Sequence, residues 1–185
     1  LSASYEDHKI AWYENNLSKG TTLYFTANTI STNETGAESV IAVDIDKDGD
    51  IDIAAVSNRS NNQVVWFNNN GSETFTATTI NSLSDANNII SEDLDRDGDV
   101  DFVVSSSGNK IYWYNNNGSQ SFTRTEIYEP TNEWPYDIFT VDLDQDGDID
   151  IISNSYSDDR VFWLENNGSQ SFTANTITTS ADHAH

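Results

Sequence analysis

Aspartate dominates three short segments of the sequence, and its spacing there is typical of a metal-binding loop. Each segment places carboxylates at positions 1, 3, 5, 7 and 9 and glycine at position 6, as in DIDKDGDID at residues 44–52. Oxygens from alternate positions can converge on one ion, and glycine permits the sharp turn that this requires. Calcium takes about six to eight oxygen ligands, so we expect three Ca²⁺ sites.

The expected ligands are the side chains at positions 1, 3, 5 and 9 and the backbone carbonyl at position 7. The fifteen residues are Asp44, Asp46, Asp48, Asp50 and Asp52, Asp93, Asp95, Asp97, Asp99 and Asp101, and Asp142, Asp144, Asp146, Asp148 and Asp150. An EF-hand is excluded because its position 12 requires Glu, where this chain has Ala55, Val104 and Ser153. Magnesium suits the loops less well because it demands strict octahedral geometry.

The overall charge excludes several classes of partner. The 185 residues carry 31 acidic and 8 basic side chains, a formal net charge of −23. Nucleic acids and anionic membrane surfaces both require clusters of Lys and Arg, so neither is expected as a partner. The chain has no cysteine and no apolar stretch near the roughly 18 residues of a membrane span, so we expect neither disulfides nor membrane insertion.

The aspartate loops belong to a longer repeat that recurs every 49 residues. An apolar run follows each loop, then a tryptophan segment such as QVVWFNNNGS, then a Thr-rich segment such as TFTATTI. An incomplete fourth copy begins the chain, because LSASYEDHKIAWYENN aligns without a gap to ISNSYSDDRVFWLENN at residues 152–167. We therefore divide the chain into a partial unit at 1–34, which lacks its first strand and calcium loop, and units at 35–84, 85–133 and 134–180.

Each full unit predicts four short antiparallel strands, as in SVIAVDI, IDIAAV, QVVWF and FTATTI of the unit at 35–84. Repeated four-stranded units of this length favour an all-β chain of β-propeller blades, with about three and a half repeats of a larger or assembled propeller. A β-sandwich is the alternative, but it would not need one motif at the same place in every unit. The recurring aromatic residues are expected to fill the layers between blades: Trp12, Trp66, Trp113 and Trp163, with Phe25, Phe75, Phe122 and Phe172.

The combination of motifs resembles a known family. D-x-D-x-D-G-D-x-D between two strands, with W-[YFL]-[NE]-N downstream, is similar to the FG-GAP/VCBS repeats of integrin α-chain propellers and of many secreted bacterial proteins. The resemblance implies a propeller, usually of seven blades, with calcium in the loop between the first two strands of a blade. The Phe-Gly and Gly-Ala-Pro elements of the family are not obvious in this sequence, so the VCBS-like branch fits better.

One linker departs from the repeat and adds aromatic residues. The segment YEPTNEWPYD at residues 128–137 contains Tyr128, Trp134 and Tyr136. These residues either pack against the neighbouring blade or form an exposed platform for sugar or protein. No catalytic constellation is visible, because the aspartates are committed as metal ligands and no Ser–His–Asp pattern can be assembled, so we do not expect an enzyme.

These features predict a calcium-stabilised binding or adhesion module, secreted or on the cell surface, that recognises a glycan or an extracellular protein. Extracellular calcium modules bind at roughly 10⁻⁴–10⁻³ M, so such sites fill outside the cell and not in a cytosol. The alternatives are a part of a secreted polysaccharide-degrading enzyme and a structural spacer in a large surface adhesin. The remaining blades of the propeller would come from the parent chain or from a second copy.

Overall fold

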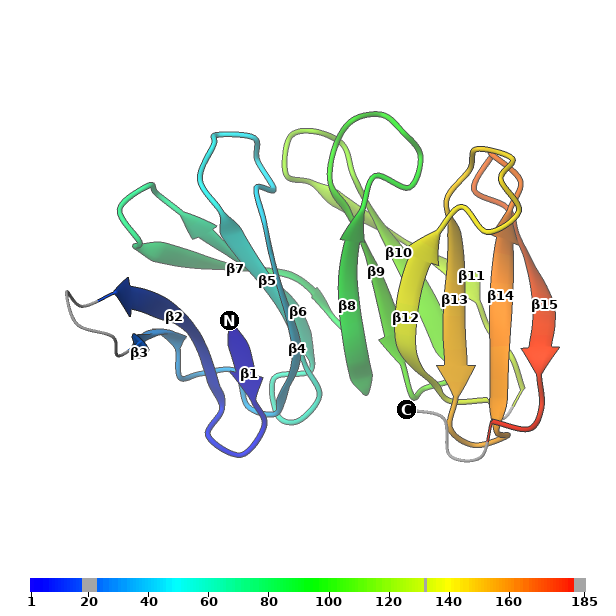
Figure 1. Ribbon diagram of the computed structural model, residues 1–185, viewed down its shortest axis with the longest axis horizontal. Helices are drawn as coiled ribbons and strands as arrows, with labels where there is room; N and C mark the ends of the chain where they lie inside the picture. The colour runs from blue at the N-terminus through cyan, green and yellow to red at the C-terminus, as the bar shows by residue number, and fades with distance from the viewer. Residues whose placement is uncertain (18–22, 132, 182–185) are drawn as a thin grey trace.

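The computed structural model of the chain describes residues 1–17, 23–131 and 133–181. The described part is built of fifteen β-strands and contains no helix (Figure 1). The strands form four separate antiparallel sheets, and within each sheet every strand pairs with the next one along the chain. The predicted all-β class is confirmed, and we number the four sheets as blades 1–4. None of the described segments forms a helix with the length and apolar character of a membrane span.

Blade 1 has three strands and the other blades have four. Blade 1 contains β1 (Ser2–Ser4), β2 (Lys9–Leu17) and β3 (Leu23–Ser31). Blade 2 contains β4 (Ala37–Val43), β5 (Asp52–Ser57), β6 (Gln63–Asn69) and β7 (Phe75–Ser82). Blade 3 contains β8 (Ala86–Glu92), β9 (Asp101–Ser106), β10 (Lys110–Asn116) and β11 (Phe122–Tyr128). Blade 4 contains β12 (Pro135–Val141), β13 (Asp150–Ser155), β14 (Arg160–Asn166) and β15 (Phe172–Thr178).

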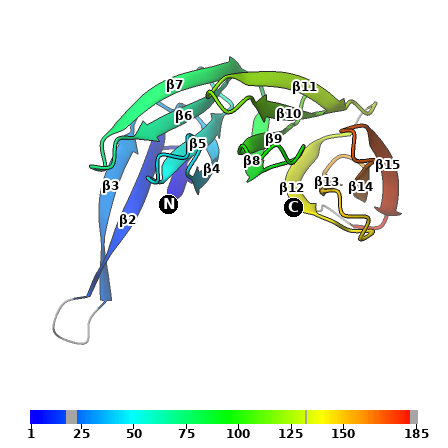
Figure 2. The same cartoon turned by 90° about the horizontal axis from the view of Figure 1, so that it is seen from above.

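The blades follow one another along an arc rather than forming a two-layer stack. Figure 2 shows the first strand of each blade on the concave side and the last strand on the convex side. The burial of the strands follows this order. Every residue of β5 and β9 is buried, as expected of an apolar strand covered on both faces, whereas the Thr-rich β7 and β11 are mostly exposed. This arrangement excludes the β-sandwich.

Apolar clusters fill the three junctions between blades. Ile10 of blade 1 packs with Ile53 and Phe67 of blade 2, and corresponding clusters join blades 2 and 3 and blades 3 and 4. Trp66 and Trp113 lie in the second and third clusters with 8% and 9% of their surface exposed. Each large apolar side chain buried here contributes about 1.5–3 kcal/mol, so the junctions are the core of the protein.

Phe25 departs from the expected packing of the recurring phenylalanines. Phe75, Phe122 and Phe172 are partly buried, and Phe122 stacks on Phe102 with ring centroids 5.0 Å apart. Phe25 is 62% exposed.

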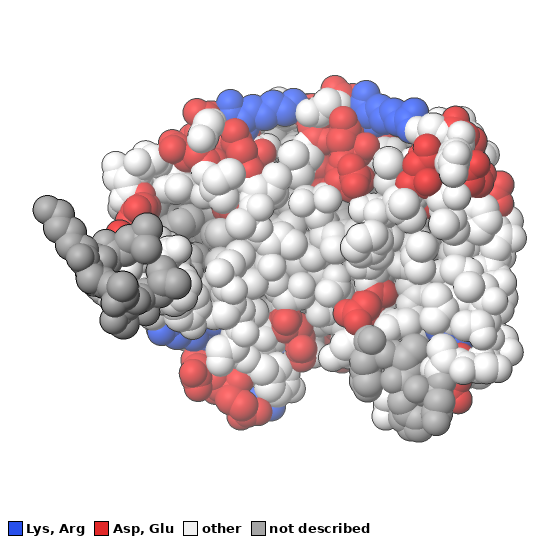
Figure 3. Space-filling view, viewed as in Figure 1, with Lys and Arg blue, Asp and Glu red and all other residues white. Residues whose placement is uncertain are grey.

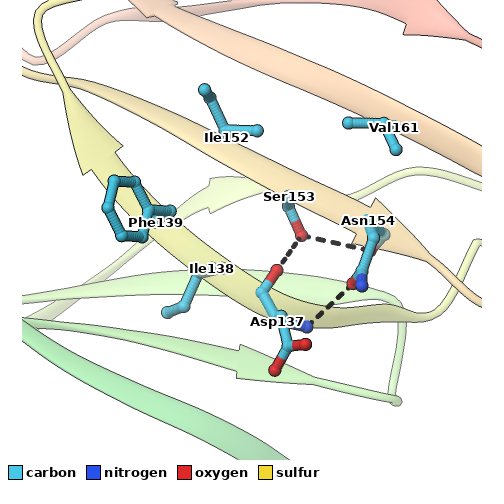
Figure 4. Close-up of a pocket in the computed structure, with 7 residues that line it drawn as sticks. All are labelled: Asp137, Ile138, Phe139, Ile152, Ser153, Asn154 and Val161. Carbon is cyan, nitrogen blue, oxygen red and sulfur yellow. Dashed lines mark hydrogen bonds between the residues drawn. The ribbon is translucent and has the colours of Figure 1, made fainter. Parts of the chain in front are cut away.

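Blade 4 leaves one apolar face uncovered. Figure 4 shows Phe139, Ile152 and Val161 on neighbouring strands around a shallow hollow, with Asp137 tied to β13 by hydrogen bonds. Phe139 is 68% exposed. Leu143 is 40% exposed, whereas its counterparts Ile45 and Leu94 are exposed by only 1% and 2% beneath the next blade.

The opposite end of the arc also leaves an apolar residue uncovered. Tyr13 of blade 1 is 45% exposed, whereas its counterparts Phe67, Tyr114 and Leu164 are exposed by 2%, 0% and 0%. Both ends of the arc therefore present surfaces that the inner blades bury against one another.

Candidate metal centres

The three aspartate loops lie along one edge of the molecule, each joining the first and second strands of blades 2–4. Figure 3 shows acidic groups gathered along this edge with basic groups between them. In each loop the carboxylates of positions 1, 3 and 5 offer oxygens that lie within 4.8 Å of one another. The three groups are Asp44, Asp46 and Asp48, Asp93, Asp95 and Asp97, and Asp142, Asp144 and Asp146. Each of these groups could hold a metal ion.

The carboxylates themselves shape the backbone of the loop. Asp46 Oδ1 accepts a hydrogen bond from the N–H of Asp48 at 3.3 Å, and Asp48 Oδ1 accepts one from the N–H of Asp50 at 2.9 Å. The same bonds recur in the other two loops. Glycine at position 6 has φ of 97° in Gly49, a conformation that favours glycine. The predicted turn at position 6 is therefore present.

One oxygen of each first aspartate is buried without a partner. Asp44 Oδ2 accepts a hydrogen bond from the N–H of Gly49 at 3.0 Å, and the corresponding bonds of Asp93 and Asp142 measure 3.0 and 3.1 Å. The Oδ1 atom of all three residues is buried and accepts no hydrogen bond from the described residues. An unsatisfied buried carboxylate oxygen is costly, and a divalent cation would supply its missing partner. The donor sets fit a hard cation such as calcium.

The aspartates at position 9 are fully buried and close the loops. Asp101 Oδ2 accepts hydrogen bonds from the N–H of Leu94 at 3.3 Å and from Trp113 Nε1 at 2.9 Å, and Oδ1 accepts one from the N–H of Asn116 at 2.7 Å. Asp52 and Asp150 accept the same two backbone hydrogen bonds. Burial raises the pKa of Asp101 to about 6 and raises the pKa of Asp52 in the same direction.

Position 9 therefore has a structural role, and its predicted role in metal binding stays a prediction. Its residues are not among the three groups of converging oxygens. A carboxylate offers about four lone-pair sites, so an oxygen that accepts one N–H can still face an ion.

The side chains at position 7 point back onto their own blade. A Cβ atom on Gly71 would come within 2.5 Å of Asp50 Oδ2, so the Asn-Gly hairpin of blade 2 lies directly on this aspartate. Gly118 and Gly168 approach Asp99 and Asp148 in the same way. Glycine, at a φ of 77° in Gly71, permits both the turn and this close approach, so the NGS hairpins also contact the loops. The sequence analysis considered only the carbonyl at this position.

Two salt bridges join successive loops. The residue at position 4 reaches the position 7 aspartate of the next loop, as Lys47 Nζ does to Asp99 at 2.5 Å and Arg96 does to Asp148 at 3.2 Å. We call this pair of contacts the interloop ladder. Its cations lie between the acidic groups along the loop edge and reduce the repulsion between neighbouring loops.

The third loop differs from the others at a site that the sequence analysis missed. Asn68 donates a hydrogen bond to Asp46 Oδ2 at 2.7 Å, and Asn115 donates one to Asp95 Oδ2 at 2.6 Å. Glu165 occupies the same place in blade 4 and accepts a hydrogen bond from Asn175. The signal was present in the repeat, because Asn or Glu stands two residues after every tryptophan of the motif.

Comparison with known proteins identifies the repeat. The family model of an FG-GAP-like repeat matches the chain four times, at residues 1–55, 44–104, 93–153 and 142–185. The chain belongs to the FG-GAP-like repeat family. The resemblance found in the sequence is therefore confirmed. No match was found among the curated proteins.

The solved structures include a similar fold of about twice the length. The FG-GAP-like chain is similar to a lectin from Agrocybe aegerita that specifically recognises non-reducing terminal N-acetylglucosamine, with a TM-score of 0.57 and 18% identity. The match covers 92% of this chain and 48% of the lectin chain, so this chain spans about half the length of the lectin. At this identity the likeness concerns the fold, and the four sheets are blades of the β-propeller type.

The three aromatic residues of the irregular linker are not brought together in this FG-GAP-like chain. Tyr128 packs on Phe162 with ring centroids 4.8 Å apart, and its hydroxyl donates a hydrogen bond to Glu133 at 2.7 Å. Burial raises the pKa of Tyr128, and Glu133 raises it further. Trp134 and Tyr136 instead line a pocket with Tyr156, which the sequence analysis did not single out.

Proposed function

We propose that this chain is a calcium-stabilised β-propeller module that binds carbohydrate outside the cell. The observation that carries the metal part of the proposal is the unpaired, buried Oδ1 atom of Asp44, Asp93 and Asp142. One such atom would be an isolated defect. In all three loops, however, the same atom lacks a hydrogen-bond donor. This repetition supports a cation-binding site in each loop.

Calcium fits these loops better than other common ions. All candidate ligands are oxygens, which favours hard cations over zinc or copper. Each loop offers carboxylate oxygens at several positions, and calcium accepts about six to eight such ligands in variable geometry, whereas magnesium demands a strict octahedron. Extracellular modules bind calcium at roughly 10⁻⁴–10⁻³ M, which supports a secreted or cell-surface location.

A binding role is favoured over catalysis. The carboxylates of the loops already accept hydrogen bonds from backbone N–H groups and pair with the cations of the interloop ladder. The similar lectin recognises a sugar, and we extend carbohydrate binding to this chain as part of the proposal. Adhesion to a glycan-bearing surface would follow from such binding.

The uncovered end faces support further blades beyond the four described. Leu143 lies where the inner blades bury its counterparts, Phe139 is 68% exposed beside it, and Tyr13 is uncovered at the other end of the arc. This chain spans about half the length of the similar lectin. We propose that further blades, from the parent chain or from a second copy, cover these end faces.

Thermal unfolding with and without calcium tests the metal part of the proposal. At free calcium ten times above Kd, each site adds about 1.4 kcal/mol, and three sites add about 4 kcal/mol. For a chain of this length we therefore expect excess EDTA to lower the Tm by roughly 8–16 °C. Magnesium at the same concentration should restore less than half of the shift. A Tm that is the same in calcium and in EDTA would contradict the proposal.

A further inference from the structure

A pocket lies at the junction of blades 3 and 4, at the end of the sheets opposite the aspartate loops. Its volume is about 470 Å³, and it is lined by Asp85 and Ser107 from blade 3 and by Trp134, Tyr136 and Tyr156 from blade 4. Trp134 is 46% exposed and Tyr156 is 37% exposed. Two large aromatic side chains thus present much of their surface to solvent in one concave place.

Comparison of the repeats shows that blade packing does not require these aromatic residues. Counted from the first aspartate of each loop, Trp134 corresponds to Asp85 in blade 3 and to Gly36 in blade 2. By the same count Tyr136 corresponds to Asn87 and Glu38, and Tyr156 corresponds to Ser107 and Asn58. Blades 2 and 3 form well-packed junctions with these small or polar residues. Trp134 and Tyr136 are therefore specific to blade 4 among blades 2–4, whereas the gapless alignment gives Tyr156 the counterpart Tyr5 in blade 1.

The junction of blades 1 and 2 lacks room at the corresponding place. The guanidinium of Arg59 lies over the ring of Tyr5, 3.9 Å from its centroid. A Cβ atom on Gly36, the counterpart of Trp134, would come within 2.7 Å of Arg59 Cγ. The space is therefore filled at that junction and open at the junction of blades 3 and 4.

Hydrogen bonds across the junction hold the pocket walls in place. Asn87 of blade 3 donates a hydrogen bond to the carbonyl of Pro135 at 3.0 Å, and Ser105 donates one to the carbonyl of Tyr136. Within blade 4 the N–H of Trp134 donates to Ser155 Oγ at 3.1 Å, and the N–H of Tyr156 donates to the carbonyl of Trp134 at 3.3 Å. The backbone on both sides of the aromatic residues is fixed before any ligand arrives, which lowers the entropic cost of binding.

The chemistry of the lining suits a sugar. Aromatic faces carry partial negative charge, so they attract the weakly positive C–H groups on one face of a pyranose ring. Asp85 is exposed, and its carboxylate has no hydrogen-bond or ion-pair partner among the described residues, so it can accept hydrogen bonds from sugar hydroxyls. The net charge of −23 disfavours sulfated, phosphorylated or other anionic sugars.

We propose that this pocket binds one neutral pyranose residue, stacked on Trp134 and Tyr156 and hydrogen-bonded to Asp85. The proposal rests on the carbohydrate-binding part of the proposed function and locates it. Tyr128 is excluded from the site because its ring packs on Phe162 and its hydroxyl is bonded to Glu133.

The test uses four methyl glycosides, those of glucose, galactose, mannose and N-acetylglucosamine, with the protein in excess calcium. We expect saturation-transfer NMR to show contact between protein and sugar ring protons for at least one of them. We expect Trp134→Ala to weaken its binding at least tenfold in a fluorescence or calorimetric titration. A variant with Trp134→Asp, Tyr136→Asn and Tyr156→Ser carries the residues of blade 3 and should abolish binding.

Matched controls separate the pocket from the rest of the molecule. Tyr24 is 51% exposed on β3, and its counterparts in blades 3 and 4 are Ser121 and Ser171, so Tyr24→Ser removes an equally exposed aromatic residue far from the pocket. This variant should bind the glycoside as the parent does, and all variants should keep the calcium-dependent Tm. Absence of binding for all four glycosides, or unchanged binding by Trp134→Ala, would overturn the inference. Because the calcium-dependent Tm is measured separately, either result would leave the metal sites standing.

Discussion

The two roles of the loop aspartates can be separated by one pair of substitutions in the second loop. Asp97 at position 5 belongs to the converging group of oxygens, and its Oδ1 accepts a hydrogen bond from the N–H of Asp99 at 2.8 Å. Asparagine keeps one oxygen for this bond, but it loses the charge and replaces the other oxygen with an NH₂ group, which is a poor ligand for a cation. We therefore expect Asp97→Asn to leave the stability in EDTA unchanged within about 0.5 kcal/mol. In calcium at ten times Kd it should lose the contribution of one site, about 1.4 kcal/mol.

Asp101 at position 9 should behave differently. Its two oxygens accept three hydrogen bonds, from the N–H groups of Leu94 and Asn116 and from Trp113 Nε1. Asparagine has one acceptor oxygen, so at least one buried N–H group must face the amide NH₂. An unsatisfied buried donor costs about 1–3 kcal/mol, and this loss needs no metal. Asp101→Asn should therefore lower the free energy of unfolding by that amount in EDTA, and by more in calcium.

Urea unfolding followed by tryptophan fluorescence gives both free energies by linear extrapolation. Each variant is measured in excess calcium and in EDTA, and the difference between the two losses isolates the metal-dependent part. Asp158→Asn serves as a control, because Asp158 is exposed and lies outside the loops. If Asp97→Asn costs as much in EDTA as in calcium, or if Asp101→Asn costs nothing in EDTA, the assignment of these roles is wrong.

Three further outcomes follow from the loops and the end faces. Arg96→Gln removes the salt bridge to Asp148 and introduces glutamine, the residue at position 4 of the third loop. In EDTA the substitution should lower the Tm by less than about 2 °C at low ionic strength, because an exposed salt bridge contributes little. In 1 M salt it should not change the Tm, because the ions screen the charges. Glu165→Asn removes the carboxylate specific to the third loop, and calorimetry should show one calcium site weakened several-fold with two unchanged. Light scattering should give a mass near 20.6 kDa if the remaining blades belong to the parent chain, and a mass near twice that value, lost in Leu143→Asp, if a second copy supplies them.

The elements and the loops of the protein were predictable because they depend on local sequence. The segment SVIAVDI was expected as a strand, and β4 covers Ala37–Val43, since the apolar run and the aspartates after it leave little choice. The spacing of Asp44, Asp46 and Asp48 likewise determines that their oxygens converge around a glycine turn. Three copies of one pattern made both predictions stronger than a single copy would have.

The contacts between blades could not be predicted from the local pattern. Lys47 reaches Asp99 only because the curvature of the arc sets two loops side by side, and the repeat does not contain that curvature. The same holds for Tyr128 and Trp134. Both stand in one irregular linker, but Tyr128 turns inward onto Phe162 while Trp134 faces the pocket. Which residue points where depends on the neighbouring blade and not on hydropathy.

Each aspartate loop connects the parts of a blade and also connects one blade to the next. The aspartate at position 9 accepts a hydrogen bond from the backbone N–H that begins the hairpin between the third and fourth strands of its own blade. The aspartate at position 7 lies against the glycine of that hairpin. Position 4 of the first two loops crosses to the following loop through the interloop ladder. An ion held by positions 1, 3 and 5 would therefore order a segment that touches the first two strands, the hairpin and the adjacent blade at once. If the loops bind metal as proposed, binding at one loop should for this reason stabilise the junction as well as the blade.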